Sequence, residues 1–141
     1  KRLIKTPKLH FVDSGLLSAL LALTAEQIAK DRSAFGAVLE TFVFSEVMKQ
    51  TTWSEDGYTL HHYRDKDQDE VDIIVENEQG ALIGIEIKAS ATVHASDFKG
   101  MRKLLDICGD DLKLGLVLYD GTKIVPFGDR LFAAPISCLW A

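Results

Sequence analysis

Residues 70–88 read EVDIIVENEQGALIGIEIK, which is two alternating apolar runs separated by a short polar turn. Alternation of apolar and polar side chains is the pattern of a β-strand that buries one face. The side chains expected on the shared apolar face are Val71, Ile73, Val75, Ile83, Ile85 and Ile87. The opposite face then carries Asp72, Ile74, Glu76, Leu82, Gly84, Glu86 and Lys88. The stretch therefore predicts a two-stranded hairpin.

The turn at residues 77–80 fixes how the two strands pair. Gly80 is free to adopt the left-handed conformation, and a three-residue loop closed by such a glycine is a favoured hairpin connection. This loop sets Asp72 opposite Glu86. It also gives three aliphatic pairs, which are Val71 with Ile87, Ile73 with Ile85 and Val75 with Ile83. A shift of one residue would place Ile and Val against Glu and Gly, so the side-chain pattern supports the same register.

Asp72 and Glu86 are candidates for a metal site, because this register makes them cross-strand neighbours. Their Cβ atoms are expected about 5 Å apart, a spacing that one divalent cation can bridge. Lys88 projects from the same face and would lie near the charge that develops on a phosphate during hydrolysis. The alternative is a solvent-facing pair, since Glu-x-Lys is common by chance. The apolar flanks favour the metal site, because a buried charge is costly unless it is used or paired.

The remaining pattern predicts helices around a sheet. The expected helices cover residues 13–23, 24–28, 33–50 and 97–108, and further strands cover residues 58–63, 112–119 and 123–127. Asp13 and Thr24 are the expected N-caps of the first two helices. This order predicts an α/β fold in which helices flank a mixed sheet.

The composition is that of one compact domain with an acidic balance. The chain has 141 residues, of which 47% are hydrophobic, so it can bury a core without disulfides. Its net charge of -5 argues against a protein that coats nucleic acid nonspecifically, because that affinity comes from Lys and Arg. The charge is uneven, since the first ten residues hold four basic side chains and no acidic ones. Residues 55–86 are acidic, which suits metal binding or solubility.

Other features bear on the setting of the chain. No apolar run approaches the roughly 20 residues that a membrane-spanning helix needs. Cys108 and Cys138 lack the spacing of a zinc site, so the reducing cytoplasm is the expected location. The chain begins at Lys1 with neither a methionine nor a signal segment, and we expect it to be a piece of a longer polypeptide.

Asp72 followed by Glu86-Ile87-Lys88 resembles the PD-(D/E)XK signature of restriction-endonuclease-like nucleases, with Val71 where the signature has proline. The order of elements from residue 33 to 119 also resembles the core of that superfamily, which is a helix, a strand meander, a helix and a further strand. The resemblance implies Mg²⁺ or Mn²⁺ as the cofactor. It implies Asp72 and Glu86 as metal ligands and Lys88 as the residue that stabilises the reacting phosphate.

More narrowly, five segments resemble the C-terminal domain of unknown function in a prokaryotic AAA+ ATPase family. They are residues 11–16 (FVDSGL), 36–40 (GAVLE), 63–64 (YR), 70–72 (EVD) and 85–88 (IEIK). This resemblance implies an ATPase module and a winged-helix-like segment upstream in the same polypeptide. It divides the chain into a helical lead-in from the upstream module at residues 1–32 and a nuclease-like domain at residues 33–141. No phosphate-binding loop of the Gly-x-x-x-x-Gly-Lys type occurs here, so ATP binding by that route is not expected.

The resemblance also places a third acidic metal ligand at Glu40, on the helix over residues 33–50. On a helical wheel Glu46 falls inside the apolar stripe, whereas Glu40 lies at its edge. The two positions are about 120° apart at 100° per residue, so one helix face cannot readily send both to one metal. We favour Glu40, because Gly36 one turn earlier leaves room for its side chain, and take Glu46 as a structural carboxylate. A surface position is the alternative for both.

Four basic residues are candidates for phosphate contacts, namely Arg64, Lys99, Arg102 and Lys103. For Arg64 the alternative is an ion pair with Glu70 or Asp72. For the other three, which form one stripe on a helix, it is a solvated surface. The four histidines show no spacing that would make a metal pair.

Two functions remain open at this point. The first is a metal-dependent nuclease-like domain that acts on nucleic acid at the C-terminus of an AAA+ ATPase. The second is a catalytically inactive module of the same fold that serves the ATPase in recognising DNA or protein. Retention of all three signature residues favours the first function, and the acidic net charge favours the second.

Overall fold

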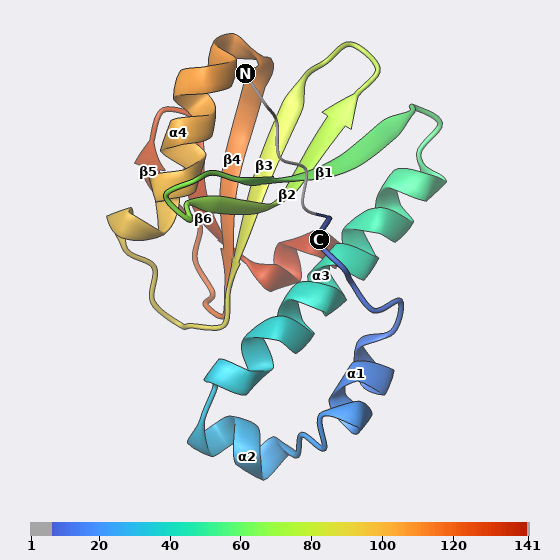
Figure 1. Cartoon of the computed structure of the whole chain (residues 1–141). Helices are drawn as coiled ribbons and strands as arrows, with labels where there is room; N and C mark the ends of the chain where they lie inside the picture. Colours follow the sequence, from blue (N-terminus) through green and yellow to red (C-terminus); the bar gives the residue numbers. More distant parts are fainter. Residues whose placement is uncertain (1–6, 141) are drawn as a thin grey trace.

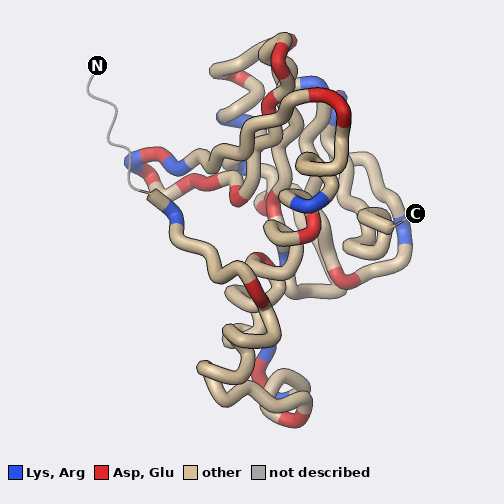
Figure 2. Tube along the Cα trace, turned by 90° about the vertical axis from the view of Figure 1, so that its right-hand side faces the viewer, with Lys and Arg blue, Asp and Glu red and all other residues tan. Residues whose placement is uncertain are grey.

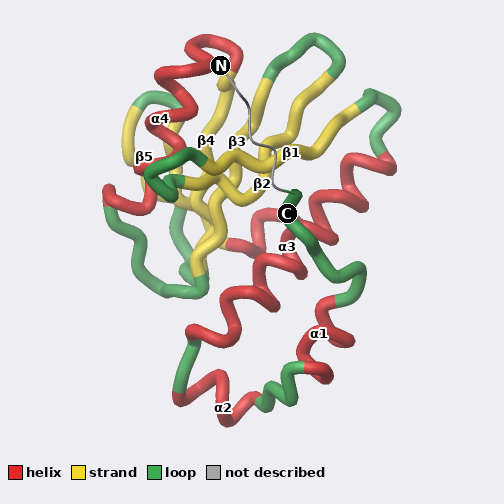
Figure 3. Tube along the Cα trace, in the orientation of Figure 1, coloured by secondary structure: helices red, strands yellow, loops and turns green. Residues whose placement is uncertain are grey.

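A computed structural model describes residues 7–140 and shows a six-stranded mixed sheet flanked by helices (Figure 1, Figure 3). The strands are β1 (Tyr58–Arg64), β2 (Glu70–Asn77), β3 (Leu82–Lys88), β4 (Leu112–Tyr119), β5 (Val125–Gly128) and β6 (Leu131–Pro135). The helices are α1 (Ser14–Leu20), α2 (Ala25–Lys30), α3 (Ser33–Trp53) and α4 (Lys99–Cys108), with short 3-10 turns at Ala95–Phe98, Gly109–Asp111 and Ile136–Trp140. The predicted α/β class, with helices around a mixed sheet, is confirmed.

The strand order is β1-β2-β3-β4-β6-β5. The first three strands form an antiparallel meander, β4 runs parallel to β3 and to β6, and β5 closes the far edge antiparallel to β6. The parallel step from β3 to β4 requires a crossover, which α4 supplies. β2, β3 and β4 are therefore the central part of the sheet, where the candidate site lies.

Two apolar cores lie on opposite faces of the sheet. α3 covers one face and contributes to a core formed by Leu39, Val43, Val47, Ile73, Val75, Ile85, Leu118 and Ala134. α4 covers the other face, and its core includes Val71, Ile74, Phe98, Met101, Leu104, Leu112, Val117 and Tyr119. α3 extends beyond the sheet, and this part packs with α1 and α2 (Figure 1).

The β2–β3 hairpin has the predicted register. Its rungs include Ile73 with Ile85 and Val75 with Ile83. Gly80 has a φ of 80°, the left-handed conformation that the turn was expected to need. The ladder runs from Glu76 to Ile73, so the expected Asp72–Glu86 pair lies just beyond its last rung.

A β-bulge in β2 separates Asp72 from the regular alternation. Ile74 is the partner of His61 and Val71 is the partner of Tyr63, so Asp72 and Ile73 together lie opposite one residue of β1. Val71 consequently packs in the α4 core with Ile74, whereas Ile73 packs in the α3 core. The prediction that Val71 shares a face with Ile73 and Ile87 is wrong, because one inserted residue reverses the alternation.

The lead-in helices begin where their caps were predicted. The Asp13 side chain accepts a hydrogen bond from the N–H of Leu16, and Thr24 and Gln27 form a reciprocal capping box. α1 ends at Leu20, three residues earlier than expected. The basic residues at positions 1, 2 and 5 lie outside the described residues. Within residues 7–140, no helix is long and apolar enough to cross a membrane.

Candidate functional site

Asp72 and Glu86 are the two acidic residues buried within the central strands. Their exposed fractions are 6% and 7%, and apolar residues of β2 and β3 flank both. Asp72 Oδ2 accepts a hydrogen bond of 2.9 Å from the N–H of Ile87, just past the end of the backbone ladder. The bulge of β2 thus places a carboxylate where the next backbone pairing would have formed. The charge of Asp72 acts on Glu86 and raises the pKa of that carboxyl.

The ammonium group of Lys8 lies between Asp72 and Glu40 of α3. Lys8 Nζ is 2.8 Å from Asp72 Oδ1 and 2.5 Å from Glu40 Oε1. Burial opposes the charge on Lys8, but its contacts with the two carboxylates outweigh burial and raise the pKa of the lysine. Two acids that are far apart in the sequence therefore share one cation.

Glu40, rather than Glu46, lies near Asp72, because the two carboxylates share the Lys8 ammonium. Glu46 lies toward the C-terminal end of α3, where it pairs with Lys49 at 2.6 Å and accepts a hydrogen bond from the indole of Trp140. The reason given for Glu40 does not hold, because a Cβ atom built at Gly36 would meet nothing within 4 Å. Space at Gly36 therefore does not decide where Glu40 lies.

Glu86 pairs with Lys88 of the same strand, at 3.0 Å between Oε1 and Nζ. Its other oxygen, Oε2, is buried and has no hydrogen-bond partner among the described residues. Burial, and then the charge of Asp72, raise the pKa of Glu86 to about 7. Burial opposes the charge on Lys88 too, but the attraction of Glu86 outweighs it and raises the pKa of the lysine. Glu86 is therefore an incompletely partnered carboxylate beside a cation.

The predicted ligands are of the chemical type that binds a divalent cation, but a lysine side chain lies between two of them. Carboxylate oxygens are the ligands that Mg²⁺ and Mn²⁺ prefer. Glu86 Oε2 has no hydrogen-bond partner among the described residues, so it is available to bind such a cation. Glu40 and Asp72 already converge on a cation, which is Lys8. Across residues 7–140, no three His, Cys, Asp or Glu side chains are grouped so that they could hold a metal as they stand.

The basic candidates are engaged within the protein. Lys103 Nζ contacts the carboxylates of Asp65, Asp67 and Asp69, and Lys99 Nζ lies 3.0 Å from Asp69. Arg102 donates to the backbone carbonyl of Phe127. Arg64 lies 3.9 Å from Glu70 and donates to Gln68. Figure 2 shows Lys and Arg interspersed with Asp and Glu along the trace, so the internal ion pairs account for these side chains better than a nucleic-acid track.

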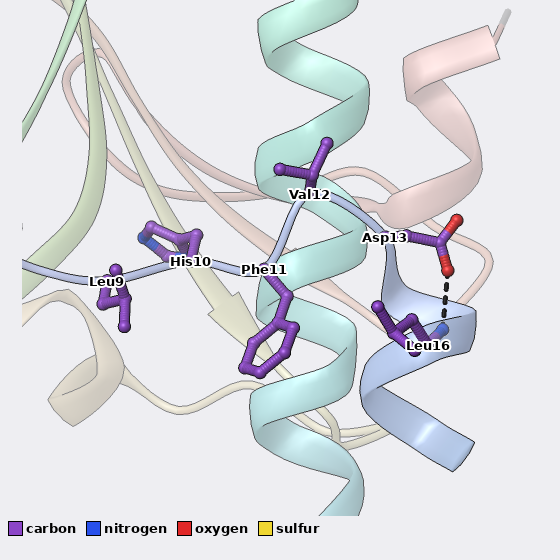
Figure 4. A pocket seen from close by; sticks show the side chains of 6 residues that line it. All are labelled: Leu9, His10, Phe11, Val12, Asp13 and Leu16. Atoms are coloured by element: carbon purple, nitrogen blue, oxygen red, sulfur yellow. Dashed lines mark hydrogen bonds between the residues drawn. The ribbon is translucent and has the colours of Figure 1, made fainter. Parts of the chain in front are cut away.

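Lys8 and His10 lie at the site but were not among the site residues predicted from the sequence. Both lie on the extended segment before α1, which runs across α3 (Figure 4). The His10 ring stacks on Phe44 of α3 with 4.1 Å between ring centroids, and His10 Nε2 is 3.9 Å from Glu40 Oε1. Burial lowers the pKa of His10, so the ring adds little positive charge near neutral pH. The excess of basic residues in the first ten positions was the signal that pointed to this segment.

Comparison with known proteins finds similarity over most of the chain. Residues 35–139 match the family described as "Domain of unknown function (DUF4143)". An uncharacterized protein of Mycobacterium bovis and one of Mycobacterium tuberculosis are each 29% identical to the chain over 137 residues. These matches cover 96% of this chain but only 29% of each relative. The chain thus spans less than a third of the length of these relatives.

Proposed function

The chain belongs to the DUF4143 family of domains of unknown function, and from this premise we propose that it is a divalent-metal-dependent nuclease-like domain of the PD-(D/E)XK type, which hydrolyses phosphodiester bonds. One observation carries the proposal. Two carboxylates, Asp72 and Glu86, are almost completely buried in the central strands; Asp72 shares the Lys8 ammonium with a third acid, Glu40, and Glu86 pairs with Lys88. Charges in such a place destabilise the fold unless they are paired or used, which favours a functional role.

Because Lys8 stands between Asp72 and Glu40, these two acids and Glu86 would hold Mg²⁺ or Mn²⁺ only after Lys8 is displaced and the three have moved together. The ion when bound would supply a Lewis acid and a water of lowered pKa. Lys88 keeps its positive charge at neutral pH, because its pKa is raised despite burial. Its side chain is 36% exposed beside Glu86, where its ammonium could meet a phosphate oxygen as negative charge develops. The Ile87 N–H holds the Asp72 carboxylate in place.

The setting of the domain is part of the same proposal. Nucleic acid is the substrate class that a metal, two carboxylates and a lysine suit best, because each of its backbone units is a phosphodiester. The resemblance to the C-terminal domain of AAA+ ATPases, and relatives of more than three times this length, support an ATPase module in the same polypeptide. Two free thiols, Cys108 and Cys138, support the cytoplasm as the compartment.

A second candidate function has one specific observation in its favour. Lys8 already neutralises Asp72 and Glu40, so these acids can serve a purely structural role. The chain would then be a catalytically inactive module of the nuclease fold, with which the ATPase recognises DNA or protein. The net charge of -5 suits a protein partner better than a nucleic-acid track.

Cleavage assays on matched variants separate the two functions. We expect the wild-type protein, in Mn²⁺ or Mg²⁺, to cleave at least one of single-stranded, duplex or branched nucleic acid. Asp72→Asn should abolish cleavage, since it removes a ligand charge. Lys88→Ala should reduce cleavage about 100-fold while the protein still binds metal, because lysine acts on the phosphate and not on the metal. Glu46→Gln, at the acid of α3 that lies outside the site, is the control and should cleave like wild type.

The outcome against the nuclease proposal is equally specific. The nuclease proposal is wrong if the wild-type protein, with its ATPase partner and ATP present, cleaves none of these substrates in Mn²⁺. Binding of metal without any cleavage supports the inactive module.

A further inference from the structure

We propose that the segment of residues 7–12, here called the strap, is a removable cover of the acidic site, and that its Lys8 ammonium and a divalent cation exclude one another at Glu40 and Asp72. This inference rests on the proposed metal site and adds its regulation. In the strapped state Lys8 supplies the positive charge that the two acids require. In the open state the strap has left and a metal ion takes the place of the ammonium group.

The position of Lys8 is the first argument. Its Nζ lies 2.5 Å from Glu40 Oε1 and 2.8 Å from Asp72 Oδ1, so the ammonium group stands between two of the predicted ligands. A divalent cation between the same oxygens would meet the ammonium at close range, and both steric overlap and repulsion of like charges forbid joint occupancy. Lys8 and the metal therefore compete for one position.

The loose attachment of the strap is the second argument. Among the hydrogen bonds of the described residues, its backbone makes one to a side chain, from Ser45 Oγ to the Val12 carbonyl at 3.4 Å, and none to a strand. Leu9 is 92% exposed and Val12 is 84% exposed. The ion pairs of Lys8 and the stacking of His10 on Phe44 are thus the main contacts that hold it.

The space around the strap is the third argument. A hollow of about 310 Å³ lies along residues Leu9 to Asp13 and Leu16, and Figure 4 shows Leu9 and Phe11 on the side of the strap away from the His10 ring. On the inner side, a pocket of about 130 Å³ borders Lys8, His10, Phe44 and Asp72. Incomplete packing on both sides means that little dispersion energy is lost when the strap leaves.

Charge balance links departure of the strap to arrival of a metal. Asp72 is 6% exposed with the strap in place, and departure of Lys8 without a replacement would leave its charge without the cation that compensates it, which is unfavourable. A divalent cation restores the balance at the same oxygens. Metal and strap should therefore exchange rather than act independently.

Titration calorimetry with Mn²⁺ on the 141-residue chain tests the competition. Lys8→Gln should bind Mn²⁺ about tenfold more tightly than wild type, because no ammonium group has to be displaced. Lys8→Arg keeps a competing cation and should bind no more tightly than wild type. Lys88→Gln is the control for the general effect of one lost positive charge beside the acids, and its gain should be clearly smaller than that of Lys8→Gln.

The contact between the His10 and Phe44 rings supplies a readout that a change of charge alone does not remove. In the wild-type protein, saturating Mg²⁺ should abolish the nuclear Overhauser effects between the two rings, because the metal displaces the strap and with it His10. Overhauser effects between β2 and β3 should stay unchanged. Asp72→Asn should abolish the response of the strap to Mg²⁺.

The failures are distinguishable. If wild type binds Mn²⁺ through Asp72, but Lys8→Gln has the same or lower affinity, or the His10–Phe44 contact persists in Mg²⁺, the strap inference is wrong and the metal site stands. If neither wild type nor Lys8→Gln binds Mn²⁺, the proposed metal site is wrong and the strap inference falls with it.

Discussion

Asp72 and Glu86 differ in how their charges are compensated, although both side chains are buried. Asp72 is held by Lys8 on one oxygen and by the N–H of Ile87 on the other. Glu86 has Lys88 at one oxygen, and its second oxygen has no partner among residues 7–140. Ionisation of Glu86 is therefore the less favourable of the two, and its pKa of about 7 reflects this.

In metal-free solution, Glu86→Gln should change how stability depends on pH. The folded pKa of Glu86 is about 7 and its ordinary value is 4.5, so the folded state holds the proton more tightly than the unfolded state. Its contribution to stability is present in full below pH 4.5 and is lost as the pH rises through about 7. The neutral glutamine removes that loss. Urea unfolding in a chelator should show the variant gaining on wild type by on the order of 2 kcal/mol between about pH 5 and pH 8.

Glu46→Gln is the control of opposite sign for this pH dependence. The hydrogen bond from Lys49 lowers the pKa of Glu46, so its ionised form stabilises the fold above the ordinary pKa. Loss of that carboxylate should therefore leave the protein no more stable at neutral pH. A constant difference between Glu86→Gln and wild type over the whole range would show that Glu86 is not strained by burial.

At the scale of elements, the hairpin was predictable because its determinants are local. The turn at Gly80 and the alternation on either side of it lie within residues 70–88, and the observed rungs follow from them. The bulge of β2 was not predictable, because alternation in the sequence runs on through Asp72 and only the pairing with β1 interrupts it. The contact of Lys8 with Asp72 joins residues 64 positions apart, so no local pattern could indicate it.

Two helical glycines give opposite predictions about packing of elements. A Cβ atom at Gly100 of α4 would overlap the carbonyl oxygen of Glu70, which is backbone and cannot turn aside, whereas one at Gly36 of α3 would meet nothing within 4 Å. Gly100→Ala should therefore destabilise the protein by about 1–3 kcal/mol, because α4 must move away from β2. Gly36→Ala should stabilise it by up to about 1 kcal/mol through helix propensity.

Urea midpoints of the two variants measure the difference between the glycines. Gly100 packs against the backbone of Glu70, which is two residues before Asp72 in β2. Displacement of α4 should therefore also weaken Mn²⁺ binding, whereas Gly36→Ala should leave that affinity unchanged. If both alanines stabilise the protein, the close approach of α4 to β2 is not a constraint on the fold.

At the scale of the whole molecule, the described chain consists of a packed sheet and a thinly attached lead-in. No residue of α1 (Ser14–Leu20) or α2 (Ala25–Lys30) is buried, and Leu16, Leu20 and Leu21 are exposed. β2 and β4 carry five of the eight largest fully buried side chains, which are Val71, Ile73, Leu112, Val117 and Leu118. An ion pair between Arg32 and Asp120 ties the end of the lead-in to the turn that follows β4. The division of the chain between residues 32 and 33 is still a prediction. It implies that α1 and α2 unfold at a lower free energy than the sheet.

Native-state hydrogen exchange of the metal-free protein tests that division. Amides of α1 and α2 should exchange through local opening at a free energy well below that of global unfolding, because these helices bury no side chain and their loss exposes little apolar surface. Amides of β2, β3 and β4 should exchange only through global unfolding. Low concentrations of urea should therefore speed exchange in the sheet while exchange in α1 and α2 barely responds, since the response scales with the surface exposed. If α1 and α2 open with the same free energy and the same urea dependence as β3, the lead-in is an integral part of the domain and the predicted boundary is wrong.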